Sequence, residues 1–255
     1  MEYPHKRQRT VGVEWPSVTL TGPGGHADDA NPGTARLREL TGPSETIDGI
    51  FCCTMGLNAE WLLKQAFDLP SSTIPIVIAC QHPERCWSPK AASRRAEAAV
   101  PNHENAVLMF PPFSDAPGNV SEYEQRRPDW RAPRGLLGCV HCKLLVVFRR
   151  DSLRVIVSTA NLSRRSWDMQ RNHLWWCDFP ALDDLSRGSN TLLPRLACGE
   201  EDDFGSELAM LMSSLMARCD PQPQDAELVS RLAVYDFRPA KDQNVHLVCS
   251  LPGIF

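Results

Sequence analysis

The stretch V-H-C-K-L-L-V-V-F-R at 140–149, followed by L-R-V-I-V-S-T at 153–159, decides the fold. Both runs are rich in β-branched and aliphatic residues, and a three-residue polar connection at 150–152 separates them, which is typical of a β-hairpin. Side chains on a strand alternate between its two faces, so His141 and Lys143 are expected to point to the same side. The hairpin therefore predicts a sheet that carries an imidazole and an ammonium group side by side.

Other segments on both sides of the hairpin alternate between strand and helix patterns. Short apolar runs predict strands at 47–55, 74–80, 105–110, 173–177 and 244–249. Apolar residues at helical spacing, or runs of good helix formers, predict helices at 58–67, 90–99, 204–218 and 225–232. Strands that alternate with helices predict an α/β fold, an α/β/α sandwich on a mixed sheet.

Composition along the chain indicates how it is organised. Residues 1–45 are rich in Gly, Pro, Thr and Asp, so they are predicted to be a partly disordered tail and lead-in before one domain at 46–255. Residues 111–135 hold five prolines and four arginines, which predicts a long loop. The basic run K-R-Q-R at 6–9 fits either a solvated tail or a nuclear import signal.

Whole-chain composition excludes several classes of protein. The 255 residues carry 27 Lys and Arg against 31 Asp and Glu, which leaves room for no more than a local basic face. No apolar run approaches the roughly 20 residues that span a bilayer, so we expect a soluble intracellular protein without a membrane partner. Most of the ten cysteines lie in apolar stretches and are expected to be reduced core residues. The run C-V-H-C at 139–142 lacks a second ligand pair, so no metal or cofactor is expected.

The hairpin also predicts a site for chemistry. Asn161, in the run S-T-A-N at 158–161, follows the second strand of the hairpin and is expected to lie beside His141 and Lys143. An imidazole nucleophile, an ammonium group and an amide donor are the groups needed to attack a phosphodiester without a metal ion. Taken alone, H-x-K recurs by chance, and a polar pair on an edge strand is the better interpretation of it. The joint pattern of H-x-K, hairpin and S-T-x-N is far more specific.

This joint pattern resembles the phospholipase D superfamily, whose H-x-K motif is followed by an Asp and a downstream G-S-x-N. Here Phe148 stands at the position of that Asp, and this departure resembles the tyrosyl-DNA phosphodiesterase branch of the superfamily. Three further segments follow in the order of that family: N-A-E-W-L-L-K-Q-A-F at 58–67, D-F-G-S-E-L-A-M-L at 203–211 and V-H-L-V-C-S-L-P-G at 245–253. The resemblance covers 46–255 and corresponds to the N-terminal half of the family's two-half fold.

The resemblance implies a metal-independent phosphoric diester hydrolase for DNA repair in the nucleus. Its implied partner is a DNA 3′ end, single- or double-stranded, that carries a covalently attached tyrosyl peptide. His141 matches the histidine that forms a phosphohistidine intermediate, while Lys143 and Asn161 match residues that hold the phosphoryl oxygens. Asn172 matches a Gln or Asn that faces the same site, and Ser250 matches a serine that contacts the DNA strand near the phosphate.

The Pro-rich loop carries a second set of candidate DNA contacts. Arg131 and Arg134 lie shortly before the H-x-K motif, with Tyr123 and Trp130 nearby, and this mixture suits contacts to phosphates. A solvated loop fits the same residues equally well. The position four residues before His141, often aromatic in the family, is Leu137, which does not provide a stacking surface there.

Only half of the family's catalytic machinery is encoded. The sequence contains one H-x-K motif, whereas the family has a second set whose histidine protonates the leaving tyrosine and then activates water. Such a general acid is worth about 10²–10⁴-fold in rate. Three interpretations follow: two copies pair as a homodimer to complete the site, the chain is a truncated gene product, or it is a non-catalytic remnant that binds DNA ends or proteins. An isolated half would also expose an apolar face.

Overall fold

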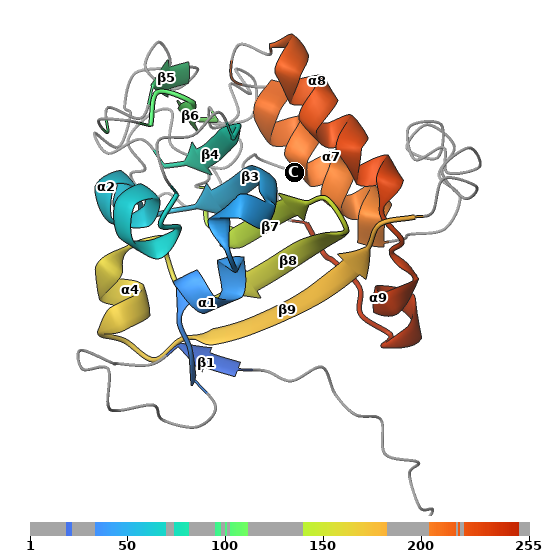
Figure 1. Cartoon of the computed structure of the whole chain (residues 1–255), viewed down its shortest axis with the longest axis horizontal. Coiled ribbons are helices and arrows are strands. Elements are labelled where there is room, and N and C mark those ends of the chain that lie inside the picture. Colours follow the sequence, from blue (N-terminus) through green and yellow to red (C-terminus); the bar gives the residue numbers. More distant parts are fainter. Residues whose placement is uncertain are drawn as a thin grey trace, which may run out of the picture.

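The computed structural model describes residues 19–21, 34–69, 74–81, 95–97, 100, 103–111, 140–182, 204–217, 219 and 222–249. In these segments nine strands form one sheet in the order β2-β1-β9-β8-β7-β3-β4-β6-β5 (Figure 1). The strands are β1 Thr19–Thr21, β2 Thr34–Ala35, β3 Ile47–Thr54, β4 Ile76–Cys80, β5 Arg95–Glu97, β6 Ala106–Met109, β7 Leu144–Arg149, β8 Ser152–Ser158 and β9 His173–Pro180.

The sheet is mixed. β3, β4 and β6 run parallel to one another, while β7, β8 and β9 form an antiparallel meander that joins β3 through β7. All five residues of β4 are buried, as expected for a parallel strand that is covered on both faces. The predicted hairpin is confirmed as β7 and β8, with Leu144 opposite Val157 and Phe148 opposite Leu153.

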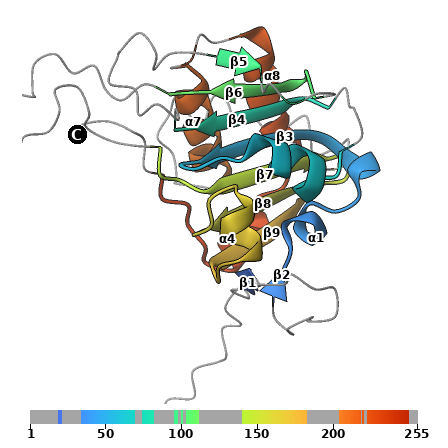
Figure 2. The same cartoon turned by 90° about the vertical axis from the view of Figure 1, so that its left-hand side faces the viewer.

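Helices cover both faces of the sheet (Figures 1 and 2). On one face lie α1 Leu37–Thr41, the 3₁₀ turn η1 Ser44–Thr46, α2 Ala59–Trp61, which continues as the π-helix η2 Leu62–Ala66, and α4 Arg164–Asp168. On the other lie α7 Phe204–Ala217 and α8 Pro223–Ser230, followed by the 3₁₀ turn η3 Arg231–Val234 and by α9 Arg238–Asp242. None of these described helices is both long and apolar enough to cross a membrane.

Alternating side chains of the central strands fill two separate cores. Phe51, Val146 and Phe148 face α7 and pack with its buried Leu208 and Met212. The residues between them face the opposite layer; Ile50, Cys52, Leu145 and Val147 pack with Leu62, Leu63, Phe67 and Trp167. Because each strand buries both of its faces, its sequence reads as a continuous apolar run. The predicted α/β/α sandwich on a mixed sheet is thereby confirmed.

The sheet begins earlier in the chain than the change of composition at Thr46 indicates. β1 pairs with β9, and α1 buries Leu37 and Leu40 against the sheet. Residues 1–18 and 22–33, and the loop at 111–135 apart from Pro111, lie outside the described residues.

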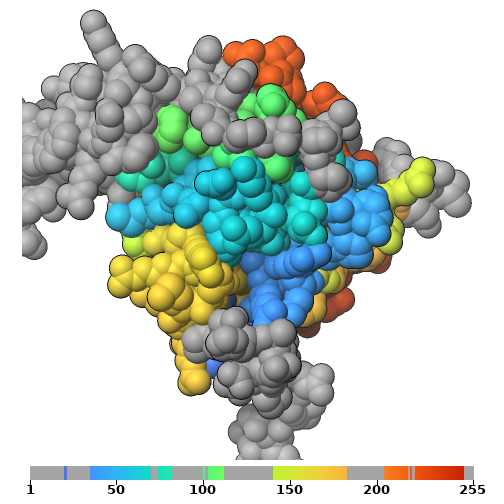
Figure 3. Space-filling model, turned by 60° about the vertical axis from the view of Figure 1, so that its left-hand side comes forward, coloured from blue at the N-terminus to red at the C-terminus, as the bar shows by residue number. Residues whose placement is uncertain are grey.

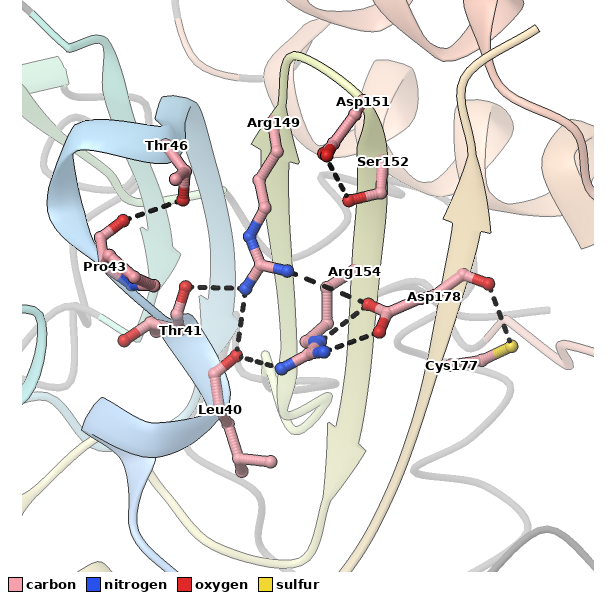
Figure 4. Close-up of polar contacts among 10 residues, drawn as sticks. All are labelled: Leu40, Thr41, Pro43, Thr46, Arg149, Asp151, Ser152, Arg154, Cys177 and Asp178. Carbon is pink, nitrogen blue, oxygen red and sulfur yellow. Dashed lines mark hydrogen bonds and ion pairs between the residues drawn. The ribbon is translucent and has the colours of Figure 1, made fainter.

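Two arginines of the β7–β8 hairpin bind α1 to the sheet (Figure 4). Arg149 donates to the carbonyl oxygens of Leu40 (3.3 Å) and Thr41 (2.7 Å), and Arg154 donates to Leu40 (2.8 Å). Arg154 also donates to both oxygens of the Asp178 carboxylate, through Nε (2.6 Å) and Nη2 (2.5 Å). The last carbonyl oxygens of a helix have no hydrogen-bond donor within the helix, and the two guanidinium groups supply the missing donors.

Three segments differ from the sequence-based predictions. The described part of the predicted helix 90–99 is β5, because Arg95–Glu97 pair with β6 at the sheet edge and strand pairing overrides helix propensity. The run 244–249 forms no strand; Val245 donates to Ala240 just after α9, and Val248 is 90% exposed. The segment 140–143 is extended but lies outside β7, which starts at Leu144.

Most of the described cysteines follow the prediction of reduced core residues, while Cys142 and Cys249 are only half-buried. Seven are free thiols, and Cys52, Cys53, Cys80 and Cys177 are buried, whereas Cys139 lies outside the described residues. Across the described part of the chain, no group of three or more His, Cys, Asp or Glu side chains is arranged to hold a metal ion.

Candidate active site

His141 and Lys143 lie in the extended segment that leads into β7. Regular pairing with β3 starts at Leu144 opposite Cys53, because β3 ends one residue later at Thr54. On the other side the ladder continues one step further, since the Ser158 N–H donates to the Lys143 carbonyl oxygen at 3.0 Å. At Lys143 the motif is therefore paired with β8, while regular pairing with β3 has already ended.

The two side chains of the motif are in contact. The Lys143 ammonium lies 3.4 Å from Nδ1 of His141 and donates to the His141 carbonyl oxygen at 2.7 Å. The His141 side chain is exposed, and Lys143 is half-buried. A positive charge beside an exposed imidazole suits the binding of an anionic group at the position where the ring can reach it.

The backbone before His141 is anchored by the neighbouring parallel strand. The buried Val140 donates its N–H to Oε1 of Gln81 at 3.4 Å, and Gln81 directly follows β4. Gln81 in turn donates its own N–H to the Thr54 carbonyl oxygen at 3.3 Å. The ends of β3 and β4 therefore act together as the support on which the H-x-K segment rests.

Asn161 lies in the loop after β8, and its amide oxygen is bound. Oδ1 accepts from the Gly56 N–H at 3.2 Å and lies 3.5 Å from the Thr54 hydroxyl. Among the described residues, the Asn161 Nδ2 group donates no hydrogen bond. The amide thus presents a donor and keeps its acceptor turned toward the protein, which is the polarity that a phosphoryl oxygen requires.

Both ends of the Asn172 amide are occupied by the protein. Nδ2 donates to the Ser166 carbonyl oxygen at 2.7 Å, and Oδ1 accepts from the Thr159 hydroxyl at 3.0 Å. Its backbone N–H donates to the hydroxyl of Thr21 at 2.9 Å. These contacts hold the loop between α4 and β9, so Asn172 supports the strand ends, while its NH₂ group keeps a second hydrogen beyond the bond to Ser166.

The predicted DNA contacts Ser250, Arg131 and Arg134 lie outside the described residues, as does Leu137. Phe148, at the position of the superfamily's Asp, is fully buried, with the Arg231 guanidinium 5.0 Å from its ring centre and the Tyr235 ring 6.3 Å away. It lies toward the far end of β7 from His141. The residue in this position is therefore part of the core.

The thiol between the two motif residues has an altered acidity. A side-chain hydrogen bond with Cys53 lowers the pKa of Cys142, and the Lys143 charge lowers it further, while burial opposes both effects. Burial raises the pKa of Cys80 to about 12. Cys142 is thus more acidic than Cys80. It follows His141 in the chain, but its side chain packs against the core on the α7 side of the sheet.

Three supporting residues were missed by the sequence analysis: Thr54, Gly56 and Gln81. Thr54 lies at the end of the apolar strand at 47–55 and Gln81 follows the one at 74–80, and a polar residue that closes such a run is the one signal that could have pointed to these two. Pairing with a segment more than 50 residues away is what gives them their contacts, and no local pattern encodes it.

A three-layer sandwich in which an H-x-K segment leads into a central strand, and an Asn follows the next strand, defines a phospholipase D-like domain. The family model for tyrosyl-DNA phosphodiesterase matches residues 18–255, so the chain belongs to this family of phosphodiesterase hydrolases. The match starts at the residue before β1 and confirms the resemblance seen in the sequence.

Solved structures agree on the fold. The crystal structure of the yeast tyrosyl-DNA phosphodiesterase is similar with a TM-score of 0.53 and 13% identity, over 88% of this chain and 42% of that one. A mutant of the yeast enzyme gives 0.52 and 14%, over 87% and 42%. The chain therefore spans less than half the length of these proteins. A comparison with curated protein sequences finds no match.

Proposed function

We propose that the chain hydrolyses 3′-phosphotyrosyl DNA linkages through a phosphohistidine at His141. The observation that carries the proposal is the contact between the Lys143 ammonium and the exposed His141 ring, 3.4 Å from Nδ1. Such a pair combines a nucleophile with the positive charge that stabilises a phosphoryl group as it gains charge in the transition state.

The proposed reaction has two steps. A ring nitrogen of His141 attacks phosphorus, the bond from phosphorus to the tyrosyl oxygen breaks, and the tyrosyl oxygen takes a proton from a general acid. Water then attacks the phosphohistidine, which frees the imidazole and leaves DNA with a 3′-phosphate. Lys143 and the Nδ2 group of Asn161 donate to the non-bridging oxygens in both steps.

Other predicted residues keep roles in the proposal. Asn172 would support the loop beside the site through Ser166 and Thr159. Ser250, Arg131 and Arg134 would contact the DNA strand. Action on DNA in the nucleus fits the basic run at 6–9 as an import signal.

The general acid is proposed to come from a second copy of the chain. The sequence holds one H-x-K motif, and the in-line reaction needs an acid on the side of phosphorus opposite His141. A homodimer that places two His141 rings across one DNA phosphate would supply a nucleophile and an acid from a single gene. Sedimentation velocity should then show a dimer, and a monomer with full turnover would contradict this part of the proposal.

Turnover and DNA binding together test the function. The chain is incubated with an oligonucleotide that carries a 3′-phosphotyrosine, and tyrosine release is measured for wild type, His141→Ala and His173→Ala. His173 is an exposed histidine at the same end of the sheet and serves as the matched control. We expect release to be lost in His141→Ala alone. DNA binding without tyrosine release by any variant would instead identify a non-catalytic module that binds DNA ends.

A further inference from the structure

Thr54 is a buried polar residue that the proposed reaction does not use. It ends β3, its side chain is 0% exposed, and its hydroxyl contacts three other residues. Oγ1 accepts from the Leu162 N–H at 3.1 Å and donates to the Gly56 carbonyl oxygen at 3.0 Å, and it lies 3.5 Å from Oδ1 of Asn161. A single hydroxyl thereby joins the segment after β3 to the segment that carries Asn161.

The backbones of these two segments also pair with each other. Leu57 and Leu162 form a parallel bridge, and the Asn58 N–H donates to the Leu162 carbonyl oxygen at 2.9 Å. At the surface the segment after β3 (cyan) lies directly against the segment around α4 (yellow) in Figure 3. Thr54 lies beneath this junction, where water does not compete for its hydrogen bonds.

The direction of each hydrogen bond sets the orientation of the Asn161 amide. A hydroxyl has one hydrogen, and the shorter contact assigns it to the Gly56 carbonyl oxygen. The hydrogen bond from Thr54 to this carbonyl oxygen holds Gly56 in place, and the N–H of Gly56 points at Oδ1 of Asn161. An amide turned by 180° would bring its NH₂ group against this N–H, two donors facing each other, so the turned state is disfavoured. Nδ2 is therefore held on the outer side.

We propose that Thr54 is a positioning residue for Asn161: acting through Gly56, its hydroxyl keeps the Asn161 Nδ2 group aimed at the phosphoryl oxygens. The role of this orientation in catalysis rests on the proposed function. The orientation itself is a property of the folded chain. Loss of a donor's alignment by about 1 Å can cost on the order of 100-fold in rate.

The first test observes the Asn161 side chain in the absence of DNA. The ¹H–¹⁵N signals of its NH₂ group are identified as those missing from Asn161→Asp, and their heteronuclear NOE is measured in the full chain. We expect a rigid amide in wild type and in Thr54→Ser, which keeps the hydroxyl, and a mobile amide in Thr54→Val, which keeps the shape. A mobile amide in wild type, or a rigid one in Thr54→Val, would overturn the proposal.

A matched control separates positioning from stability. Thr41 is equally buried, and its hydroxyl donates to the Arg38 carbonyl oxygen at 3.1 Å, but it lies at the other end of the sheet. Thr41→Val should lose one donated hydrogen bond, like the bond from Thr54 to Gly56, and leave the Asn161 amide rigid. If Thr54→Val does not fold, Thr54→Ala removes the same hydroxyl, and a rigid Asn161 amide in that variant would overturn the proposal.

The second test measures the rate of phosphohistidine formation on a 3′-phosphotyrosyl oligonucleotide in a single turnover. We expect Thr54→Val to be slower than Thr41→Val by about tenfold or more, with DNA binding within about twofold, because the aligned donor acts chiefly in the transition state. Thr54→Ser should recover most of the rate. Equal rates for the two Val variants would overturn the positioning role. If wild type forms no adduct, the proposed function fails, and the NMR test alone decides the role of Thr54.

Discussion

The backbone N–H of Gly56 donates to Oδ1 of Asn161 at 3.2 Å, across 105 residues of chain. This bond brings the turn after β3 to the loop after β8 at the end of the sheet where His141 and Lys143 enter β7. The candidate site is thus assembled from the ends of three strands, β3, β4 and β8, and from the beginning of β7. Each of its groups lies within a few residues of the end of a strand in the buried sheet, which limits how far the site can distort.

Replacing Lys143 with Met removes the ammonium group and keeps most of the aliphatic stem. We expect phosphohistidine formation to fall by about 10²–10³-fold, the usual effect of losing one donor to a developing oxyanion. Folding should change little because the Lys143 side chain is half-buried and near the surface. Quenched-flow measurement of the adduct, with circular dichroism of the variant, checks both expectations. A rate within threefold of wild type would remove Lys143 from the mechanism.

The arginines that bind α1 should matter for stability and not for chemistry. Arg154→Met leaves the half-buried Asp178 without its two short hydrogen bonds and the Leu40 carbonyl oxygen without one donor. We expect a loss of about 2 kcal/mol in the free energy of unfolding in urea. Arg164→Met, which breaks the exposed pair with Asp168 on α4, is the control and should change stability by less than about 0.5 kcal/mol. Similar losses for both would contradict a structural role for this cluster.

Phe148 stands where the superfamily has an Asp, and its side chain fills the core between the sheet and the α8 region. Phe148→Asp would bury a carboxylate at a fully enclosed position, and we expect a loss of more than about 4 kcal/mol, which is enough to unfold many domains. Phe148→Leu should cost far less, about 1–2 kcal/mol. Thermal unfolding of the two variants distinguishes them. A stable Asp variant would mean that this end of β7 admits water.

Cys142 should be the most reactive of the seven described cysteines. The thiolate is the reactive form, and the hydrogen bond from Cys53 together with the Lys143 charge lowers the pKa of Cys142, so a larger fraction is ionised at neutral pH. Burial raises the pKa of Cys249 to about 12 and that of Cys177 to about 11. Labelling with iodoacetamide between about pH 6 and 9, followed by peptide mapping, should modify Cys142 first. The reactivity should move to higher pH in Lys143→Met, and earlier labelling of Cys177 would contradict the assignment.

The sequence was informative wherever a short pattern determined the structure. The hairpin of β7 and β8 and the helix that starts at Asn58 could be predicted, because β-branched runs and an N-cap are local signals. The Asn58 side chain does accept from the Trp61 N–H, at 3.0 Å. The order of strands in the sheet, and the place of β1 beside β9, depend on pairing between distant segments that no local pattern specifies.

Errors arose where tertiary contacts overruled a local preference. Residues 95–97 read as helix formers but extend along β6, and the apolar run at 244–249 has the composition of a strand but finds no partner strand in the described sheet. In the candidate site, the two-residue spacing of His141 and Lys143 was enough to predict that their side chains lie side by side. Thr54 and Gly56, which hold Asn161, could not be predicted from the sequence, because they act through a single hydroxyl and a backbone N–H.

The central claim is that a nitrogen of His141 becomes bonded to phosphorus. The most direct measurement is to quench the reaction of the full chain with a 3′-phosphotyrosyl oligonucleotide, digest it under alkaline conditions that preserve phosphohistidine, and locate the phosphorus by mass spectrometry. We predict a nucleotide adduct on the peptide that contains His141, and none in His141→Ala. An adduct on another residue, or tyrosine release that proceeds unchanged in His141→Ala, would contradict the account.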